Sequence, residues 1–316
     1  MGRAFTTVQA GKADDIIAPA RIPNLFCEPT KRPNQTGGIN METRYVADPV
    51  RFERMNSQEL RDSFLIDKIF SDGKVDLVYS FDDRAIIGSA VPSKGPLKLE
   101  AGKELACEYF AERREIGVIN IGAKGTVTVD GKKFALDTKD MLYIGKGSKD
   151  ITFESADGKS PAKFYLVSYP AHAEYPTAMA KQSEAVTVPL GSDECSNKRV
   201  IYKYIHPDGI KSCQLVMGCT DLATGNVWNT MPGHTHTRRT EVYMYFNVGD
   251  DSAVAHFIGK PDQTRHIIIR NQQAVLSPSW SIHGGAGLKN YSFVWSMGGE
   301  NQAFGDMQAF SLDELR

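Results

Sequence analysis

Short runs in which apolar and polar residues alternate dominate the chain from about residue 75 onward. Such alternation is the pattern of half-buried β-strands. Asp130-Gly131 separates the runs 126–130 and 133–137, and this dipeptide predicts a tight hairpin. A second series of similar runs extends from Arg199 to about Met297. Many short strands joined by glycine-rich turns predict an all-β protein, built as an antiparallel sandwich or barrel.

The segment ahead of these strands has a different pattern. Asn56-Ser-Gln-Glu59 resembles a capping box and is followed by Leu60, Phe64 and Leu65 on one helical face, which predicts a short helix. Residues 1–40 contain several prolines and a Gly-Gly pair and have little periodicity. We expect a flexible N-terminal extension there. An arm that drapes over a neighbouring subunit is the alternative, and Met41 is a second candidate for the natural start.

The two strand series resemble each other. Residues 113–122 are similar to residues 238–249, and residues 140–147 are similar to residues 273–280. Such internal similarity indicates a duplicated fold. We therefore predict an N-terminal barrel over residues 41–170, a proline-containing linker over 171–190 and a C-terminal barrel over 191–316. The first histidine is His172, so a histidine-based site can form only in the second barrel.

Composition limits the function classes. The chain has 316 residues and a net charge of −1, which does not favour nucleic acid or an anionic membrane as a partner. No apolar run approaches the roughly 20 residues that a bilayer-spanning helix needs. The five cysteines are odd in number and contain no C-x-x-C, a pattern typical of a reduced protein. We expect a cytoplasmic protein with no membrane or nucleic-acid partner.

The strongest chemical signal is a group of potential metal ligands. His234 and His236 point the same way if the backbone is extended, and the turn 237–240 would return Glu241 from the next strand. His283 ends the turn-rich run 278–283 and is a fourth candidate. Imidazole and carboxylate ligands suit zinc, iron, manganese or nickel. His-x-His-x4-Glu followed by a distant histidine is the ligand pattern of the cupin β-barrel. The remaining histidines are expected to make ordinary contacts: His172, His206, His256 and His266.

Several separated motifs resemble the 5-keto-4-deoxyuronate isomerases, a bicupin family of bacterial pectin breakdown. They are residues 112–122, 143–147, 228–243, 277–283 and 298–302. The resemblance runs from about Met41 to Arg316 and does not cover residues 1–40. It implies a duplicated cupin fold (a double-stranded β-helix or jelly-roll barrel) with a few short helices, and a homohexamer. It also implies one Zn²⁺ per subunit, held by His234, His236, Glu241 and His283.

The resemblance implies a reaction as well. The family converts 5-dehydro-4-deoxy-D-glucuronate to 3-deoxy-D-glycero-2,5-hexodiulosonate, through an enediolate that the metal stabilises. A protein group must carry the proton within hydrogen-bond reach of the substrate. Lys203, Tyr243 and Tyr245 are candidates for residues that line the pocket. Arginine suits bidentate binding of the uronate carboxylate. Arg238 and Arg239 are preferred over Arg265 and Arg270, because this doublet lies next to the predicted ligands in the sequence.

Three other functions remain open from the sequence. A related sugar-acid isomerase of the 5-deoxy-glucuronate type would use the same chemistry on another substrate. A cupin dioxygenase would use a similar histidine-rich site with iron. A non-catalytic sugar-binding cupin is the third, although a binding barrel has no need of a complete ligand set.

Overall fold

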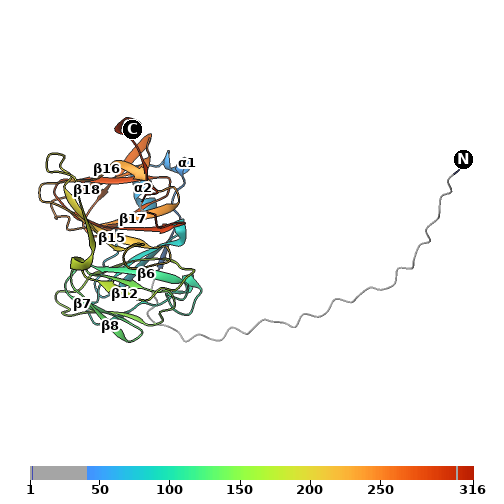
Figure 1. The fold of residues 1–316 in the computed structure, drawn as a ribbon, viewed down its shortest axis with the longest axis vertical. Helices are drawn as coiled ribbons and strands as arrows, with labels where there is room; N and C mark the ends of the chain where they lie inside the picture. The colour runs from blue at the N-terminus through green and yellow to red at the C-terminus, as the bar shows by residue number, and fades with distance from the viewer. Residues whose placement is uncertain (1, 3–40, 304) are drawn as a thin grey trace. The chain divides into compact units, whose positions relative to one another are not determined.

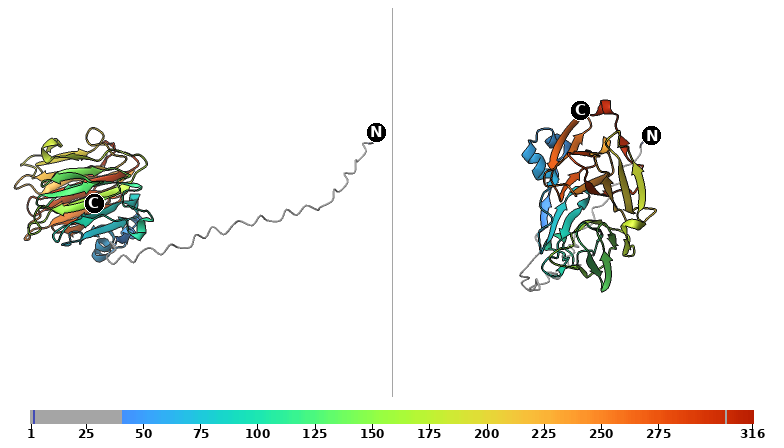
Figure 2. Two further views of the ribbon diagram at one scale, coloured as in Figure 1. Left: turned by 90° about the horizontal axis from the view of Figure 1, so that it is seen from below. Right: turned by 90° about the vertical axis from the view of Figure 1, so that its left-hand side faces the viewer.

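The computed structural model of the chain describes residue 2, residues 41–303 and residues 305–316. The predicted N-terminal extension therefore lies outside the described residues, apart from Gly2. The described chain is built almost entirely of strands, which form four sheets stacked in layers (Figures 1 and 2). Two sheets make each half of the molecule, and the two larger sheets face each other in the middle.

The N-terminal half pairs a seven-stranded sheet, the N-inner sheet, with a four-stranded N-outer sheet. In order, the N-inner strands are β1 (Met41–Arg44), β3 (Val75–Ser80), β4 (Ile86–Ala90), β11 (Phe164–Pro170), β6 (Arg114–Asn120), β9 (Met141–Ile144) and β12 (Ala178–Ala180). The N-outer strands are β5 (Leu97–Lys98), β10 (Ile151–Ser155), β7 (Gly125–Val129) and β8 (Lys132–Leu136). The predicted hairpin joins β7 to β8, with positive φ at both Asp130 and Gly131 as a type I′ turn requires.

The C-terminal half repeats this arrangement with a C-inner and a C-outer sheet. In order, the C-inner strands are β13 (Val186–Leu190), β14 (Arg199–Ile205), β15 (Val216–Leu222), β22 (Ser292–Gly299), β17 (Arg239–Phe246), β20 (Gln273–Ser277) and β2 (Leu65–Ile66). The C-outer strands are β19 (Gln263–Ile269), β18 (Val254–Lys260), β21 (Ile282–Gly287), β16 (Trp228–Thr235) and β23 (Gln308–Ala309).

The strand order confirms the duplication predicted from the sequence. The repeat that links residues 113–122 to 238–249 corresponds to β6 and β17. Each of these is the fifth strand in the order of its inner sheet. The repeat at 140–147 and 273–280 corresponds to β9 and β20, the next strands along. The described chain is thus an all-β protein of two cupin-type barrels.

One edge strand of the C-inner sheet comes from a distant part of the chain. β2 comes from the N-terminal segment but pairs with β20 of the C-inner sheet. The helices α1 (Pro49–Phe52) and α2 (Ser57–Phe64) precede it, and their side chains Phe52 and Phe64 are buried in the core of the C-terminal half. The segment 47–66 therefore packs with the second barrel, although the sequence placed it in the first.

The segment between the halves is also structured. β12 extends the N-inner sheet through β9, and β13 extends the C-inner sheet through β14. The predicted linker 171–190 thus supplies one edge strand to each half. Four short 3-10 turns complete the regular structure of the described residues: Asp82–Arg84, Lys103–Leu105, Gln182–Glu184 and Leu312–Glu314. The predicted capping box of α2 is present, with Asn56 and Glu59 exchanging side-chain and backbone hydrogen bonds.

The inner strands carry apolar residues on both faces because both faces are buried. On β9, Leu142 and Ile144 belong to the core between the two N-terminal sheets, whereas Met141 and Tyr143 belong to the core between the halves. Gly117 lies at a close approach of the two halves, since a Cβ there would lie 2.5 Å from Met217 Sδ of the other half. The two halves therefore share one continuous apolar interface.

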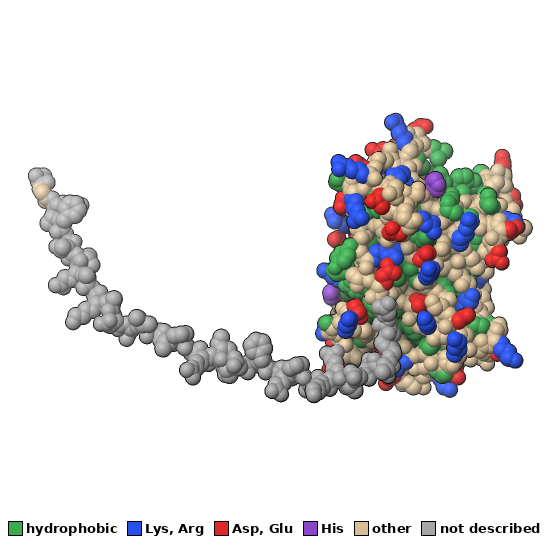
Figure 3. All heavy atoms as spheres, turned by 180° about the vertical axis from the view of Figure 1, so that it is seen from behind, with side chains coloured by type: hydrophobic (Ala, Val, Ile, Leu, Met, Phe, Trp, Pro, Cys, Tyr) green, Lys and Arg blue, Asp and Glu red, His purple; other side chains and the backbone are tan. Residues whose placement is uncertain are grey.

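The surface agrees with the near-zero net charge. Lysine and arginine side chains are interspersed with aspartate and glutamate over the face that Figure 3 displays. Within the described chain, no helix is long and apolar enough to cross a membrane. The cysteines of the described residues are free thiols: Cys107, Cys195, Cys213 and Cys219.

Candidate metal centre

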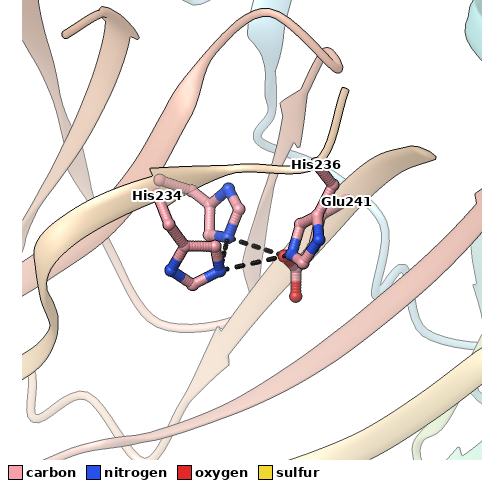
Figure 4. A group of neighbouring side chains, drawn as sticks. His234, His236 and Glu241 are labelled. Carbon is pink, nitrogen blue, oxygen red and sulfur yellow. Dashed lines mark hydrogen bonds and ion pairs between the residues drawn. The ribbon is translucent and has the colours of Figure 1, made fainter. Parts of the chain in front are cut away.

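Three strands of the C-terminal barrel bring the four predicted ligands together. His234 lies near the end of β16, and its register partner across the sheet is His283 on β21. His236 follows β16 directly, and after a tight turn Glu241 enters on β17. Figure 4 shows His234, His236 and Glu241 pointing toward one another. The ligating atoms of all four side chains lie within 4.8 Å of one another.

The short distances join the atoms that ligate metals. His234 Nε2 lies 3.2 Å from His236 Nε2 and 3.0 Å from His283 Nε2. Glu241 Oε2 lies 2.7 Å from His283 Nε2 and 3.2 Å from His236 Nε2. His236, Glu241 and His283 are buried, and His234 is half-buried. Three imidazole nitrogens and one carboxylate oxygen thus converge on a common point.

This arrangement fits a divalent metal ion. Glu241 Oε2 is buried and, despite its short contacts, makes no hydrogen bond of good geometry among the described residues. Burial and the neighbouring His283 lower the pKa of His234 to about 3, so this imidazole is neutral and offers a lone pair. A neutral imidazole and a carboxylate are the protonation states that metal binding needs. A set of three histidines and one glutamate suits zinc and other divalent transition metals.

Asp306 contacts His236 on the side of the ring that faces away from the other ligands. This role of Asp306 was not predicted from the sequence. Its Oδ1 lies 2.8 Å from His236 Nδ1, which leaves His236 Nε2 to face the other ligands. Arg239 Nε donates to Asp306 Oδ2 at 2.9 Å, and Arg239 Nη2 also contacts Oδ1. Burial raises the pKa of Asp306, but Arg239 and His236 outweigh burial and lower the pKa to about 2. Asp306 is therefore a carboxylate that orients a ligand.

Replacing Asp306 by asparagine is expected to weaken metal binding. The amide removes the negative charge that holds the Nδ1 proton of His236, and loss of such a partner typically costs about 10- to 100-fold in metal affinity. Competition with a zinc-binding dye measures this affinity. Asp313→Asn, at an exposed position in the same C-terminal segment, is the matched control. Equal affinities for the two variants would contradict this role of Asp306.

A cavity of about 430 Å³ opens beside the cluster in the C-terminal barrel. His234, His236 and Glu241 line it, as do the predicted residues Lys203 and Tyr243. Tyr245, the third residue predicted to line the pocket, is not among the residues that line this cavity. Its side chain lies on the same face of β17 but deeper in the barrel, where its hydroxyl is 2.7 Å from His256 Nδ1.

The two predicted arginines, Arg238 and Arg239, lie in different surroundings. Arg238 is exposed, lies outside this cavity and approaches Glu300, with Nε 3.7 Å from Oε2. Arg239 lines the cavity, but its guanidinium is engaged by Asp306 and by the carbonyl of Ala303, and its remaining Nη1 is buried. The predicted substrate contact by both arginines does not follow from this geometry. The other two local arginines donate to backbone carbonyls elsewhere: Arg265 to Met55 and Arg270 to Ser252.

Another cavity residue, Arg199, was also missed. It begins β14, two and four residues before Ile201 and Lys203, and all three side chains line the cavity. This is the strand period of two. The sequence signal was present in the alternation of Arg199-Val-Ile-Tyr-Lys203, but the sequence alone does not tell which face of the strand meets the site.

The fold and the side-chain cluster together define a bicupin whose second barrel can hold a divalent metal ion. Comparison with known proteins makes the assignment narrower: residues 64–311 match the KduI/IolB family, and the chain belongs to it. It is 56% identical over 276 residues to the 4-deoxy-L-threo-5-hexosulose-uronate ketol-isomerase of Lachnoclostridium phytofermentans. It is 52% identical over 276 residues to the protein of that name from Halalkalibacterium halodurans. Each comparison covers 87% of this chain and 100% of the relative.

A solved structure shows the same fold at low sequence identity. An IolB-like protein from Salmonella typhimurium superposes with a TM-score of 0.63 and 12% identity, over 78% of this chain and 96% of the other. The predicted family and the predicted fold class are both confirmed.

Proposed function

We propose that this chain is a metal-dependent ketol-isomerase that converts 4-deoxy-L-threo-5-hexosulose uronate to 3-deoxy-D-glycero-2,5-hexodiulosonate in pectin and uronate degradation. The observation that carries the proposal is the complete three-histidine, one-glutamate cluster beside a cavity, in a chain 52–56% identical to relatives with that name. The shared name of these relatives favours this substrate over a 5-deoxy-glucuronate.

In this proposal His234, His236, Glu241 and His283 hold one Zn²⁺ per subunit. When bound, the ion supplies Lewis-acid stabilisation of the negative charge that develops on the substrate oxygens during proton transfer. The protein acts in the cytoplasm as a homohexamer. The donor set supports zinc but suits other divalent transition metals as well, so metal analysis of the purified protein decides this point.

The protein side chains have separate tasks in the proton transfer. A ketol isomerisation takes a proton from the hydroxyl-bearing carbon and delivers it to the neighbouring carbonyl carbon. A second proton passes from the hydroxyl oxygen to the carbonyl oxygen. Burial raises the pKa of Tyr243 well above 10, so its hydroxyl stays protonated and donates a hydrogen bond. The carboxylate of Glu241 points toward His236 and His283 of the ligand cluster, so we do not assign the proton transfer to it. We assign the proton transfer to Lys203, whose side chain lines the cavity.

The test is the conversion of defined substrates by the purified, zinc-loaded protein, followed by NMR of the products. Conversion of 4-deoxy-L-threo-5-hexosulose uronate with no oxygen uptake is the expected result. Faster conversion of 5-deoxy-glucuronate would assign the chain to the other sugar-acid isomerase activity. Oxygen uptake with the uronate would indicate a dioxygenase, and no conversion of either compound would contradict an isomerase.

A further inference from the structure

The cavity beside the ligand cluster carries more cationic than anionic side chains. Its lining includes Arg199, Lys203 and Arg239, whereas Glu241 is the only carboxylate among its lining residues. Asp306 neutralises Arg239 from behind the cavity. An excess of positive charge in a concave site favours an anionic ligand.

Arg199 differs from Arg239 in how its guanidinium is engaged. Its Nη1 donates to the backbone carbonyl of Asn197 at 2.7 Å. Among the described residues, other arginines form ion pairs with carboxylates but Arg199 does not, and its side chain is half-buried. The remaining donors of its planar group are thus available to a ligand with two adjacent oxygens.

The surroundings of Arg199 strengthen an interaction with an anion. Apolar residues of β14 and β22 line the same cavity: Ile201, Phe293, Trp295 and Met297. Burial lowers the pKa of Arg199. Tyr243 lines the same cavity as Arg199. Tyr243 in turn packs against His283, with 5.3 Å between the ring centroids. Charge-assisted hydrogen bonds are stronger where water and mobile ions are excluded.

We infer that Arg199 binds the carboxylate of the substrate and holds the opposite end of the molecule at the ligand cluster. This inference rests on the proposed function and names the recognition residue for the uronate group. In a hexosulose uronate the carboxylate and the aldehyde stand at opposite ends of a six-carbon chain. Arg199 on β14 lines the same cavity as three of the ligands, namely His234, His236 and Glu241. The cavity can therefore receive both ends of the substrate.

The test compares Arg199→Met with the wild type and with Arg238→Met, the matched control whose side chain lies outside the cavity. In Arg199→Met we expect KM for the uronate to rise on the order of 10- to 100-fold, the range for loss of a charge-assisted hydrogen bond. We expect kcat within about threefold of wild type, because the ligand cluster is untouched. In Arg199→Lys we expect KM to rise less than in Arg199→Met, since lysine keeps the positive charge but lacks the two parallel N–H donors of the guanidinium. Equal zinc content and circular dichroism establish that each variant is folded.

Binding without turnover separates this inference from the proposed function. Wild-type protein should bind D-glucuronate more tightly than the neutral D-glucuronamide in calorimetry, and Arg199→Met should lose this preference. If the wild type does not isomerise the uronate but shows the preference and the variant loses it, the proposed function fails and the carboxylate site stands. An unchanged KM or an unchanged preference in Arg199→Met would overturn the inference, as would a loss confined to kcat.

Discussion

Glu115→Ala is expected to lower the free energy of unfolding by about 3–5 kcal/mol, the usual range for removing one partner of a buried charged network. Glu115 lies on β6, is fully buried and faces the other half of the molecule. Its carboxylate accepts hydrogen bonds from the backbone N–H groups of Cys213, Gln214 and Leu215 at 2.7–2.8 Å. The Tyr143 hydroxyl donates a fourth at 2.8 Å. Alanine would leave these donors buried without an acceptor.

Urea-induced unfolding of the metal-loaded protein measures the effect. Glu154→Ala is the control, because Glu154 is an exposed residue on β10 of the same half and its loss should change the free energy of unfolding by less than about 0.5 kcal/mol. A loss below about 1 kcal/mol for Glu115→Ala would contradict the assigned role, since even one unsatisfied buried donor costs that much. Thus the first barrel, which has no histidine before His172, fixes a turn of the barrel that holds the ligands.

His283→Ala is expected to lower kcat by about 10³-fold or more and to reduce the bound zinc. The proposed metal supplies several kcal/mol of charge stabilisation, and a loss of ~4 kcal/mol corresponds to about a thousandfold in rate. His283 comes from β21, so its removal opens one side of a cluster that otherwise depends on β16 and β17. Steady-state turnover and metal analysis of the same preparation measure both effects together.

His266→Ala is the matched control for His283→Ala. His266 lies on β19 of the same C-outer sheet but is exposed and does not line the cavity. This variant should keep its zinc, and its kcat should stay within about twofold of wild type. If His283→Ala retained both zinc and kcat, His283 would have no part in the metal centre.

The ligand set could be predicted from the sequence because local geometry determines most of it. His234 and His236 share a face by the strand period, and a tight turn brings Glu241 back beside them. The fold class followed from many short alternating runs, and the repeat at β6 and β17 exposed the duplication. His283 was chosen because it ends a turn-rich run and completes the ligand pattern of a cupin, not because its distance along the chain from the other ligands predicts contact.

The roles of Asp306 and Arg199 could not be predicted from the sequence because they depend on long-range packing. Asp306 lies 70 residues from His236 in the chain, and no periodic pattern links them. The strand of Arg199 was predicted, but which of its faces meets the cavity depends on the pairing of β14 with β13 and β15. Arg238 lies outside the cavity, whereas Arg239 lines it but is engaged by Asp306. Nearness in sequence to the ligands does not decide which way a side chain points at the end of a turn.

The segment 47–66 shows the same limit for domain boundaries. Its helix was predicted from the capping box, but its burial against the second barrel depends on the pairing of β2 with β20. That contact joins positions about 200 residues apart in the sequence, and local patterns do not record it.

The most direct test of the central claim is turnover of 4-deoxy-L-threo-5-hexosulose uronate by the purified protein before chelation, after chelation and after zinc is added back. We predict that isomerisation disappears as the metal is removed and returns in proportion to the zinc bound, reaching its maximum at one ion per subunit. Full turnover in protein shown to be free of metal would contradict the claim that the cluster of His234, His236, Glu241 and His283 holds a catalytic ion.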